Sequence, residues 1–177
     1  HTWNTGATSS TITVTSGGTY SVVNSLNGCT ARDTIDIAID PVPVLNLGAD
    51  IAICADETTQ LDATYAGASY SWSTGATSST ITVNTTGDYS VTSTLGNCSA
   101  KDTVTVMVNP LPVVNLGTDT TICANATLQL DAAYTGASHA WNTGATSSAI
   151  TVTTAGDYSV VNTLNGCISR DTITVSV

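Results

Sequence analysis

Five cysteines are the residues of this chain best suited to covalent chemistry, and they recur at a fixed interval. Cys29, Cys98 and Cys167 lie 69 residues apart, and Cys54 and Cys123 keep the same interval. No Cys-x-x-Cys pair and no cluster of Cys and His occurs, so a zinc site is not expected. Two cysteines in each small repeat indicate disulfides instead, and with them an oxidising, extracellular compartment.

Histidine is too scarce to support an active site. It occurs only at His1 and His139, and Tyr70 takes the position of His139 in the middle repeat. A catalytic base would not be replaced by tyrosine between near-identical copies, and nucleophilic catalysis needs a base within hydrogen-bond reach. Glycoside cleavage by paired carboxylates needs a cleft, and no long insertion is present to build one. We therefore expect no enzymatic activity.

Aspartates recur near the start of each repeat, as Asp50 in "LGAD" and Asp119 in "LGTD". Calcium needs six to eight oxygen ligands, and each of these carboxylates is a candidate to supply one at a junction between repeats. The interpretation we favour is a turn-capping residue, because no DxDxDG run is present. No cofactor is expected, and calcium at Asp50 or Asp119 is the alternative.

The positions above belong to a tandem repeat. The phrase "AWNTGATSSAITV" at Ala140–Val152 has near copies beginning at Thr2 and Ser71, and residues 41–108 match residues 110–177 at 43 of 68 positions without a gap. Such a fixed period indicates a repeat architecture. We predict the C-terminal part of a truncated repeat at 1–40 (unit 1) and complete repeats at 41–109 (unit 2) and 110–177 (unit 3). We expect this to be a window cut from a longer array.

Alternation of apolar and hydroxyl side chains predicts strands throughout, with Gly, Asn, Asp and Pro clusters as turns. Six or seven short strands per unit with regular turns indicate a β-sandwich. The fold class is therefore all-β, with tandem immunoglobulin-like (Ig-like) domains of about 69 residues arranged head to tail. The predicted strands of unit 2 are Val42–Gly48, Thr58–Thr64, Ser69–Thr74, Thr80–Asn84, Asp88–Leu95 and Lys101–Val108.

Two disulfide connectivities are compatible with this map. The favoured one pairs Cys54 with Cys98 and Cys123 with Cys167, because each complete unit is then self-contained. The alternative joins neighbouring units. In an Ig-like topology the turn before the second strand and the last hairpin lie at opposite ends of a domain. If Cys54 lies in that turn, Cys98 is beyond the reach of a disulfide within its own unit. Cys29 is the odd cysteine, and the register places its partner before the first residue.

Aromatic residues recur at the same interval and are predicted to be structural. One tryptophan per unit on the third strand is expected in the core, with a carbohydrate-stacking platform as the alternative. One tyrosine per unit, in "GTYSV" or "GDYSV", has the position of the tyrosine corner of such sandwiches. The expected core residues are Trp3, Trp72, Trp141, Tyr20, Tyr89 and Tyr158.

The combined phrase LGxDxxIC, LDA, YxWSTGATSxxITV, GxYSV, Cys and DTxxV covers the whole chain. It resembles the Ig-like/PKD-like repeats of Bacteroidota surface proteins, including the stalks of type IX-secreted proteins such as gliding-motility adhesins of the SprB kind. The resemblance implies an extended protein that is secreted or displayed on the bacterial cell surface.

The same resemblance implies a modification. Asp-Thr dipeptides look like the Asp-Thr-hydrophobic O-glycosylation sequon of this bacterial group, and a glycan there would solubilise a threonine-rich strand edge. The alternative is a plain strand start. The candidate sites are Thr34, Thr103, Thr120 and Thr172.

Charge and linker composition favour a structural role. Three Lys and Arg against 13 Asp and Glu give a net charge of −10, which disfavours nucleic acid and anionic membranes as partners. A short linker at Asn109–Pro110 restricts bending, so we expect a rod-like stalk for adhesion or motility. The alternatives are a self-assembling fibre, a glycan-binding module, and spacer modules of a secreted enzyme. The expected partners are neighbouring repeats, other copies in a filament, and a glycan or surface ligand at the tip.

Overall fold

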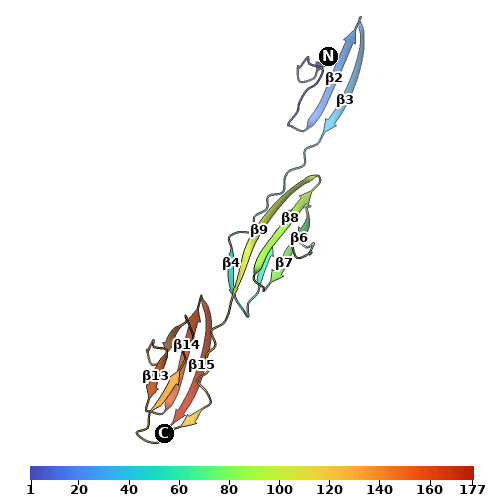
Figure 1. The fold of residues 1–177 in the computed structure, drawn as a ribbon. Coiled ribbons are helices and arrows are strands. Elements are labelled where there is room, and N and C mark those ends of the chain that lie inside the picture. Colours follow the sequence, from blue (N-terminus) through green and yellow to red (C-terminus); the bar gives the residue numbers. More distant parts are fainter.

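The structure, a computed structural model, describes all residues from His1 to Val177 and contains strands and loops but no helix. Three groups of strands lie one after another along an extended molecule, with the two termini at opposite ends (Figure 1). Each strand pairs only with strands of its own group. The all-β prediction is confirmed, and the chain is a row of β units rather than one globule.

Unit 2 is a sandwich of a four-stranded and a two-stranded sheet. The larger sheet has the order β4-β9-β8-β6, and the smaller one pairs β5 with β7. Strand β4 runs parallel to β9, whereas the other pairs are antiparallel. The strands are β4 (Ile51–Cys54), β5 (Thr59–Asp62), β6 (Ser69–Trp72), β7 (Thr80–Val83), β8 (Gly87–Leu95) and β9 (Cys98–Asn109).

Unit 3 repeats this arrangement, with the sheet order β10-β15-β14-β12 and the pair β11-β13. Its strands are β10 (Thr120–Thr121), β11 (Leu128–Asp131), β12 (Ser138–Trp141), β13 (Ala149–Val152), β14 (Gly156–Leu164) and β15 (Cys167–Ser176). The parallel first strand on the edge of the last strand, together with two sheets of unequal size, gives the Ig-like sandwich that the strand pattern predicts.

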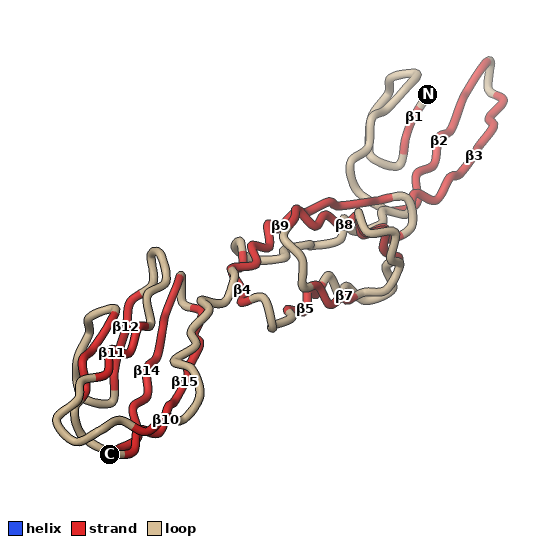
Figure 2. Tube along the Cα trace, turned by 60° about the horizontal axis from the view of Figure 1, so that its bottom comes forward, coloured by secondary structure: helices blue, strands red, loops and turns tan.

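Unit 1 has a single sheet, in the order β1-β2-β3. Its strands are β1 (Thr2–Trp3), β2 (Gly18–Leu26) and β3 (Cys29–Ile37). Figure 2 shows these three strands with a long loop between β1 and β2 and no second sheet beside them. Unit 1 therefore corresponds to the back half of units 2 and 3.

One predicted strand of unit 2 is wrong. Residues Val42–Gly48 pair with no other strand, and the first strand is β4. Pro43 has no N–H to donate to a ladder, and Pro41 directly before the segment has none either, so the start of a strand here would lack donors. The other five predicted strands are present as β5 to β9, with ends that differ by at most three residues.

Each complete unit encloses its own core, and the tryptophan of the third strand lies at its centre. Trp72 is 3% exposed and Trp141 is 4% exposed, and each indole N–H donates to a backbone carbonyl, of Ser78 at 2.8 Å and of Ser147 at 2.9 Å. Burial with a satisfied N–H identifies these side chains as core residues rather than exposed stacking platforms. The buried cluster of unit 3 is Leu130, Ala132, Trp141, Val152, Tyr158, Val160, Ile173 and Val175.

Candidate functional site

A disulfide joins units 2 and 3. Cys54 is bonded to Cys167, and their Cα atoms are 5.5 Å apart. Strand β4 brings Cys54 to this place, because its parallel pairing with β9 sets Cys54 opposite Asn109, the last residue before the linker. Cys167 is the first residue of β15, directly after the hairpin turn of unit 3. The end of one unit is therefore covalently fixed to the start of the next.

This bond corrects the favoured pairing of Cys54 with Cys98. Cys98 begins β9 and Cys54 lies opposite its end, so the two are separated by nearly the whole length of a 12-residue strand. At about 3.3 Å per residue that is about 36 Å, whereas a disulfide needs Cα atoms within about 7 Å. The same argument excludes a bond between Cys123 and Cys167. The alternative, a bond between neighbouring units, is confirmed.

The residues around the disulfide pack against the linker. Cys167 is only 1% exposed, and its sulfur lies 3.9 Å from the carbonyl oxygen of Asn109. The side-chain amide of Asn109 donates across the junction to the carbonyl of Asn165 at 3.5 Å. Pro112, just inside unit 3, is fully buried. The junction is thus a packed contact as well as a covalent one.

The hairpin that presents Cys167 is fixed by its turn residues. Asn165 and Gly166 have φ values of 49° and 85°, the left-handed pair that a two-residue type I′ turn requires. The pairing of Leu164 with Cys167 closes this turn and continues along all of β14 and β15. The Asn-Gly dipeptide is therefore the local sequence signal that places Cys167 at the tip facing unit 2.

The junction between units 1 and 2 has the same cysteine-to-carbonyl contact but no disulfide. The Cys98 thiol donates to the carbonyl of Asp40 at 3.4 Å, as the Cys167 sulfur meets Asn109. The backbone N–H of Asn97 donates to the Asp40 carboxylate at 3.4 Å. Cys98 is a free thiol in this structure, and residues 1–40 contain no strand equivalent to β4.

Cys29 and Cys123 are also free, and both are exposed. Cys29 lies at the hairpin tip of unit 1, the place that Cys167 has in unit 3. Cys123 follows β10 at the far end of unit 3, the place that Cys54 has in unit 2. Each free cysteine therefore lies at an end of a unit, where the bonded pair also lies.

The three recurring tyrosines have the hydrogen bond that defines a tyrosine corner. The hydroxyl of each one donates to the backbone carbonyl four residues earlier: Tyr20 to Ser16 at 2.8 Å, Tyr89 to Thr85 at 2.9 Å and Tyr158 to Thr154 at 3.0 Å. Tyr89 and Tyr158 are buried in their units. These hydroxyls tie the crossover loop to the start of the next strand.

The recurring aspartates hold the first strand segment on the last strand. Asp50 accepts a hydrogen bond from the backbone N–H of Thr105, and Asp119 accepts one from Thr174, each at 2.9 Å. Both bonds span 55 residues, so they are not the local turn caps that the sequence suggested. No group of three or more His, Cys, Asp or Glu side chains gathers at either position.

The threonines of the Asp-Thr motif differ in exposure. Thr34, Thr103 and Thr172 are exposed on the last strand of their units, whereas Thr120 is half-buried in β10. In each exposed case the preceding aspartate accepts a hydrogen bond from the threonine N–H, at 2.8 to 2.9 Å. The hydroxyls of the three exposed threonines are accessible for modification.

His139 has a cross-strand partner, which explains its replacement by tyrosine in unit 2. Its Nδ1 lies 2.9 Å from Oδ1 of Asn162, the residue opposite it in the β12–β14 ladder. In unit 2 the corresponding pair is Tyr70 and Ser93, and the Tyr70 hydroxyl donates instead to the carbonyl of Tyr65 at 2.8 Å. The pair changes together, as expected for a packing contact.

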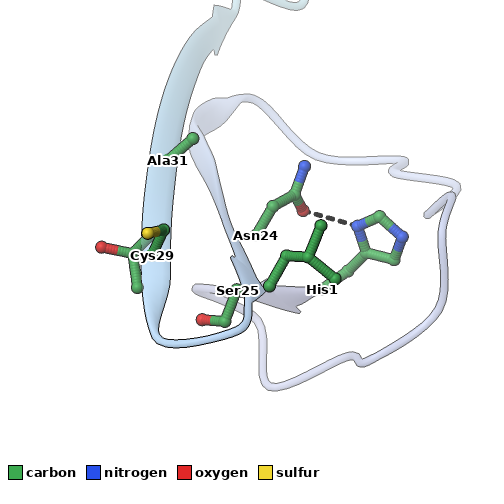
Figure 3. A pocket seen from close by; sticks show the side chains of 7 residues that line it. His1, Asn24, Ser25, Cys29 and Ala31 are labelled. Atoms are coloured by element: carbon green, nitrogen blue, oxygen red, sulfur yellow. Dashed lines mark hydrogen bonds between the residues drawn. The ribbon is translucent and has the colours of Figure 1, made fainter.

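The hollows of the surface are shallow and concentrate on unit 1. Figure 3 shows one of them, where the His1 ring points to the Asn24 side chain and Cys29 lies on the adjacent strand. A second hollow is lined only by apolar and aromatic side chains: Trp3, Ile12, Val14, Tyr20, Ile35 and Ile37. In units 2 and 3 the front half of the sandwich covers the corresponding face.

Comparison with known proteins identifies the fold. No protein-family model and no curated protein matches the sequence. The N-terminal eight Ig domains of the Down syndrome cell adhesion molecule (DSCAM) match at a TM-score of 0.58 and 14% identity, over 91% of this chain and 31% of that chain. This chain thus spans about a third of that structure, and at this identity the likeness shows the Ig-like fold alone.

Two further solved structures match at a TM-score of 0.49. Extracellular domains 3–5 of Drosophila OTK share 11% identity over 91% of this chain and 71% of that chain. The I-band fragment I67–I69 from titin shares 12% identity over 90% of this chain and 74% of that chain.

The structure contains no helix with the length and apolar character needed to span a membrane.

Proposed function

We propose that this chain is a non-catalytic structural segment of a long extracellular adhesin or filament, in which Ig-like units form a rod-shaped stalk. The observation that carries the proposal is the disulfide between Cys54 and Cys167. A single peptide linker lets two domains pivot about one point. Units 2 and 3 are held by two covalent connections, the peptide at Asn109–Pro110 and the disulfide, and a second attachment point opposes bending and rotation.

An extracellular location is supported by the same bond, because structural disulfides persist in oxidising compartments and are rare in the cytosol. The resemblance of the repeat phrase supports the finer proposal: display on a bacterial cell surface after type IX secretion, in adhesion or gliding motility. Antibody labelling of intact source cells tests the location. Labelling only after the cells are permeabilised would contradict it.

The free cysteines support an array in which every junction is closed in this way. Cys98 occupies the position of Cys167, and Cys123 occupies the position of Cys54. Units of the same kind on either side would supply the missing partners. Each bond would form when two thiols lose two electrons and two protons to an extracytoplasmic thiol-disulfide oxidant.

Negative-stain electron microscopy of the oxidised chain tests the stalk. We expect single rods with a narrow distribution of angles between units 2 and 3, and a broader distribution in the Cys54→Ser variant. The matched control is Cys29→Ser, which removes an exposed thiol far from that junction. Equally broad distributions in oxidised wild type and Cys54→Ser would contradict the stalk. Ordered fibres with regular contacts between chains would favour self-assembly instead.

We also propose O-glycosylation at Thr34, Thr103 and Thr172, which the repeat resemblance implies and which their exposure supports. Mass spectrometry of peptides from native material tests this proposal. A sugar mass on these threonines is expected, and fully unmodified peptides would contradict it. Thr120, being half-buried, is expected to carry less.

A further inference from the structure

We propose that the Cys54–Cys167 disulfide makes units 2 and 3 almost inextensible under tension, because it completes a covalent path of already extended backbone along both units. The inference rests on the proposed stalk function, in which the chain carries load between its two ends. It goes beyond that function by assigning the disulfide a mechanical role distinct from setting the angle at the junction.

The first part of the path is the segment from Pro41 to Cys54. Its last eight residues, Leu47–Cys54, span the same distance along unit 2 as eight residues of β9. Leu47 donates its N–H to the Asp102 carboxylate at 2.7 Å, and Cys54 lies opposite Asn109. Between these points both segments advance by seven residues. The bond between Asp50 and Thr105 keeps the same offset of 55. The segment therefore advances in step with β9 from Leu47 to the end of unit 2, and its last four residues, Ile51–Cys54, pair with β9 as the parallel strand β4.

The disulfide then transfers the path to unit 3. From Cys167 the chain continues through β15, a single strand that pairs with β14 from Cys167 to Val175 and ends at Ser176. The two bonded cysteines are separated by 113 positions in the sequence. Residues 55–166, which include most of both cores, therefore lie inside a closed loop. Tension applied at the two ends bypasses them.

The lengths show how complete this bypass is. The path from Pro41 to Cys54 and from Cys167 to Val177 contains about 25 residues, or about 85–90 Å at the limit of about 3.3–3.6 Å per residue. The same segments already rise about 3.3 Å per residue where they lie as strands. Pulling them from the sheets adds about 10 Å. Without the disulfide, residues 41–177 would extend to about 450–490 Å.

As a consequence, unfolding of unit 2 or unit 3 under tension adds almost no length to the chain between its two ends. If tension detaches β4 or β15 from its neighbours, the looped residues carry no load and are free to pair with them again. In the reduced chain the same event would continue into complete unfolding of the unit.

Single-molecule force spectroscopy of the full chain, pulled by its two ends, tests the proposal. The variant with Cys29, Cys98 and Cys123 each replaced by serine leaves Cys54 and Cys167 as the only cysteines, and peptide mapping verifies their bond. We expect the final contour length of this oxidised chain to be shorter than that of the reduced chain by about 400 Å, the length of the looped residues. The matched control adds Cys54→Ser and is expected to be insensitive to reductant.

Equal contour lengths with and without reductant would overturn the inference. A difference of about 150–160 Å in wild type would mean that a bond within one unit, either Cys54–Cys98 or Cys123–Cys167, has formed instead, since each loops only about 44 residues. The contour-length result can be distinguished from the test of the stalk proposal, which measures the angles between units 2 and 3. Rigid rods with no hidden length would contradict this inference alone, and hidden length in flexible chains would contradict only the rigid stalk.

Discussion

Unit 1 and unit 3 contain a nearly identical segment, residues 2–14 and 140–152, but the two copies differ in secondary structure. In unit 3, Ala149–Val152 forms β13 and pairs with β11. In unit 1 the corresponding residues Thr11–Val14 form no strand. Their own sequence is almost unchanged, but the strand they would pair with belongs to the front half of a unit, which is not among residues 1–40. A short strand of this kind exists only when its partner is present.

The core shows the same contrast. Ile173 of unit 3 is 3% exposed, whereas Ile35, its counterpart, is 57% exposed. Local features survive without the core. The indole of Trp3 still donates to the Ser9 carbonyl, and Gly6 keeps a φ of 85° in the turn that follows, as Gly144 does in unit 3. Contacts made within a few residues form from the back half alone, and burial requires the second sheet.

Completing unit 1 should produce the largest effect. Placing a copy of residues 110–138 directly before His1 supplies the missing front half in register. We expect unit 1 to fold cooperatively with a stability of about 4–10 kcal/mol, as for a domain of this size, and the added cysteine to bond to Cys98. Hydrogen exchange at Thr11–Val14 and alkylation of Cys98 measure the two results. Unprotected amides at Thr11–Val14 and a freely alkylated Cys98 would contradict the expectation that the front half is all that residues 1–40 need in order to fold.

Truncation of the matched isoleucines should give the next largest effect. Ile173→Ala removes a buried side chain from the core of unit 3, so a loss of about 2–5 kcal/mol is expected. Ile35→Ala removes an exposed one and should change stability by less than about 0.5 kcal/mol. Chemical denaturation followed by hydrogen exchange in each unit makes the measurement. Similar losses in both variants would show that unit 1 has a core after all.

The asparagine pair gives a smaller effect of the same kind. Asn162 is fully buried and donates from Nδ2 to the carbonyl of Ala132 at 2.8 Å, while Asn24 in unit 1 is exposed. Asn162→Ala leaves that carbonyl without its partner, so we expect a cost of about 1–3 kcal/mol. Asn24→Ala should be nearly neutral. Denaturation of the two variants side by side decides whether burial or the residue type sets the cost.

The smallest effect concerns a difference between the two complete units. The Thr64 side chain, and then its backbone N–H, donate to Asp62 and lower the pKa of that carboxyl; unit 3 has Ala133 in place of Thr64. A lowered folded-state pKa stabilises the unit above the unfolded pKa, and that contribution is lost as pH falls through the folded one. We expect Thr64→Ala to raise the pKa of Asp62 in an NMR titration. An unchanged pKa would show that the backbone N–H suffices.

Most of the secondary structure and the core positions of the aromatics in units 2 and 3 were predictable from the amino-acid sequence. Trp3 and Tyr20 were also predicted to lie in a core, but they are only half-buried. The period of 69 residues, the alternation within each strand and the Asn-Gly turn are all local signals, and five of the six strands predicted for unit 2 are present. Trp72 and Tyr89 have the buried positions that their places in the strand order predict. The strand predicted at Val42–Gly48 is absent, because the alternation of side chains does not show that proline leaves a strand without ladder donors.

Only the tertiary structure decided which cysteines meet. The sequence supplied two cysteines per unit, and the pairing it favoured, within a unit, is wrong, because the spacing of the cysteines along the chain does not show where each one lies in the folded sandwich. The parallel pairing of β4 with β9 places Cys54 at the far end of unit 2, and the β14–β15 hairpin places Cys167 at the near end of unit 3. A disulfide forms only between side chains a few ångströms apart, so the end-to-end stacking of units selected the bond that sequence periodicity could not.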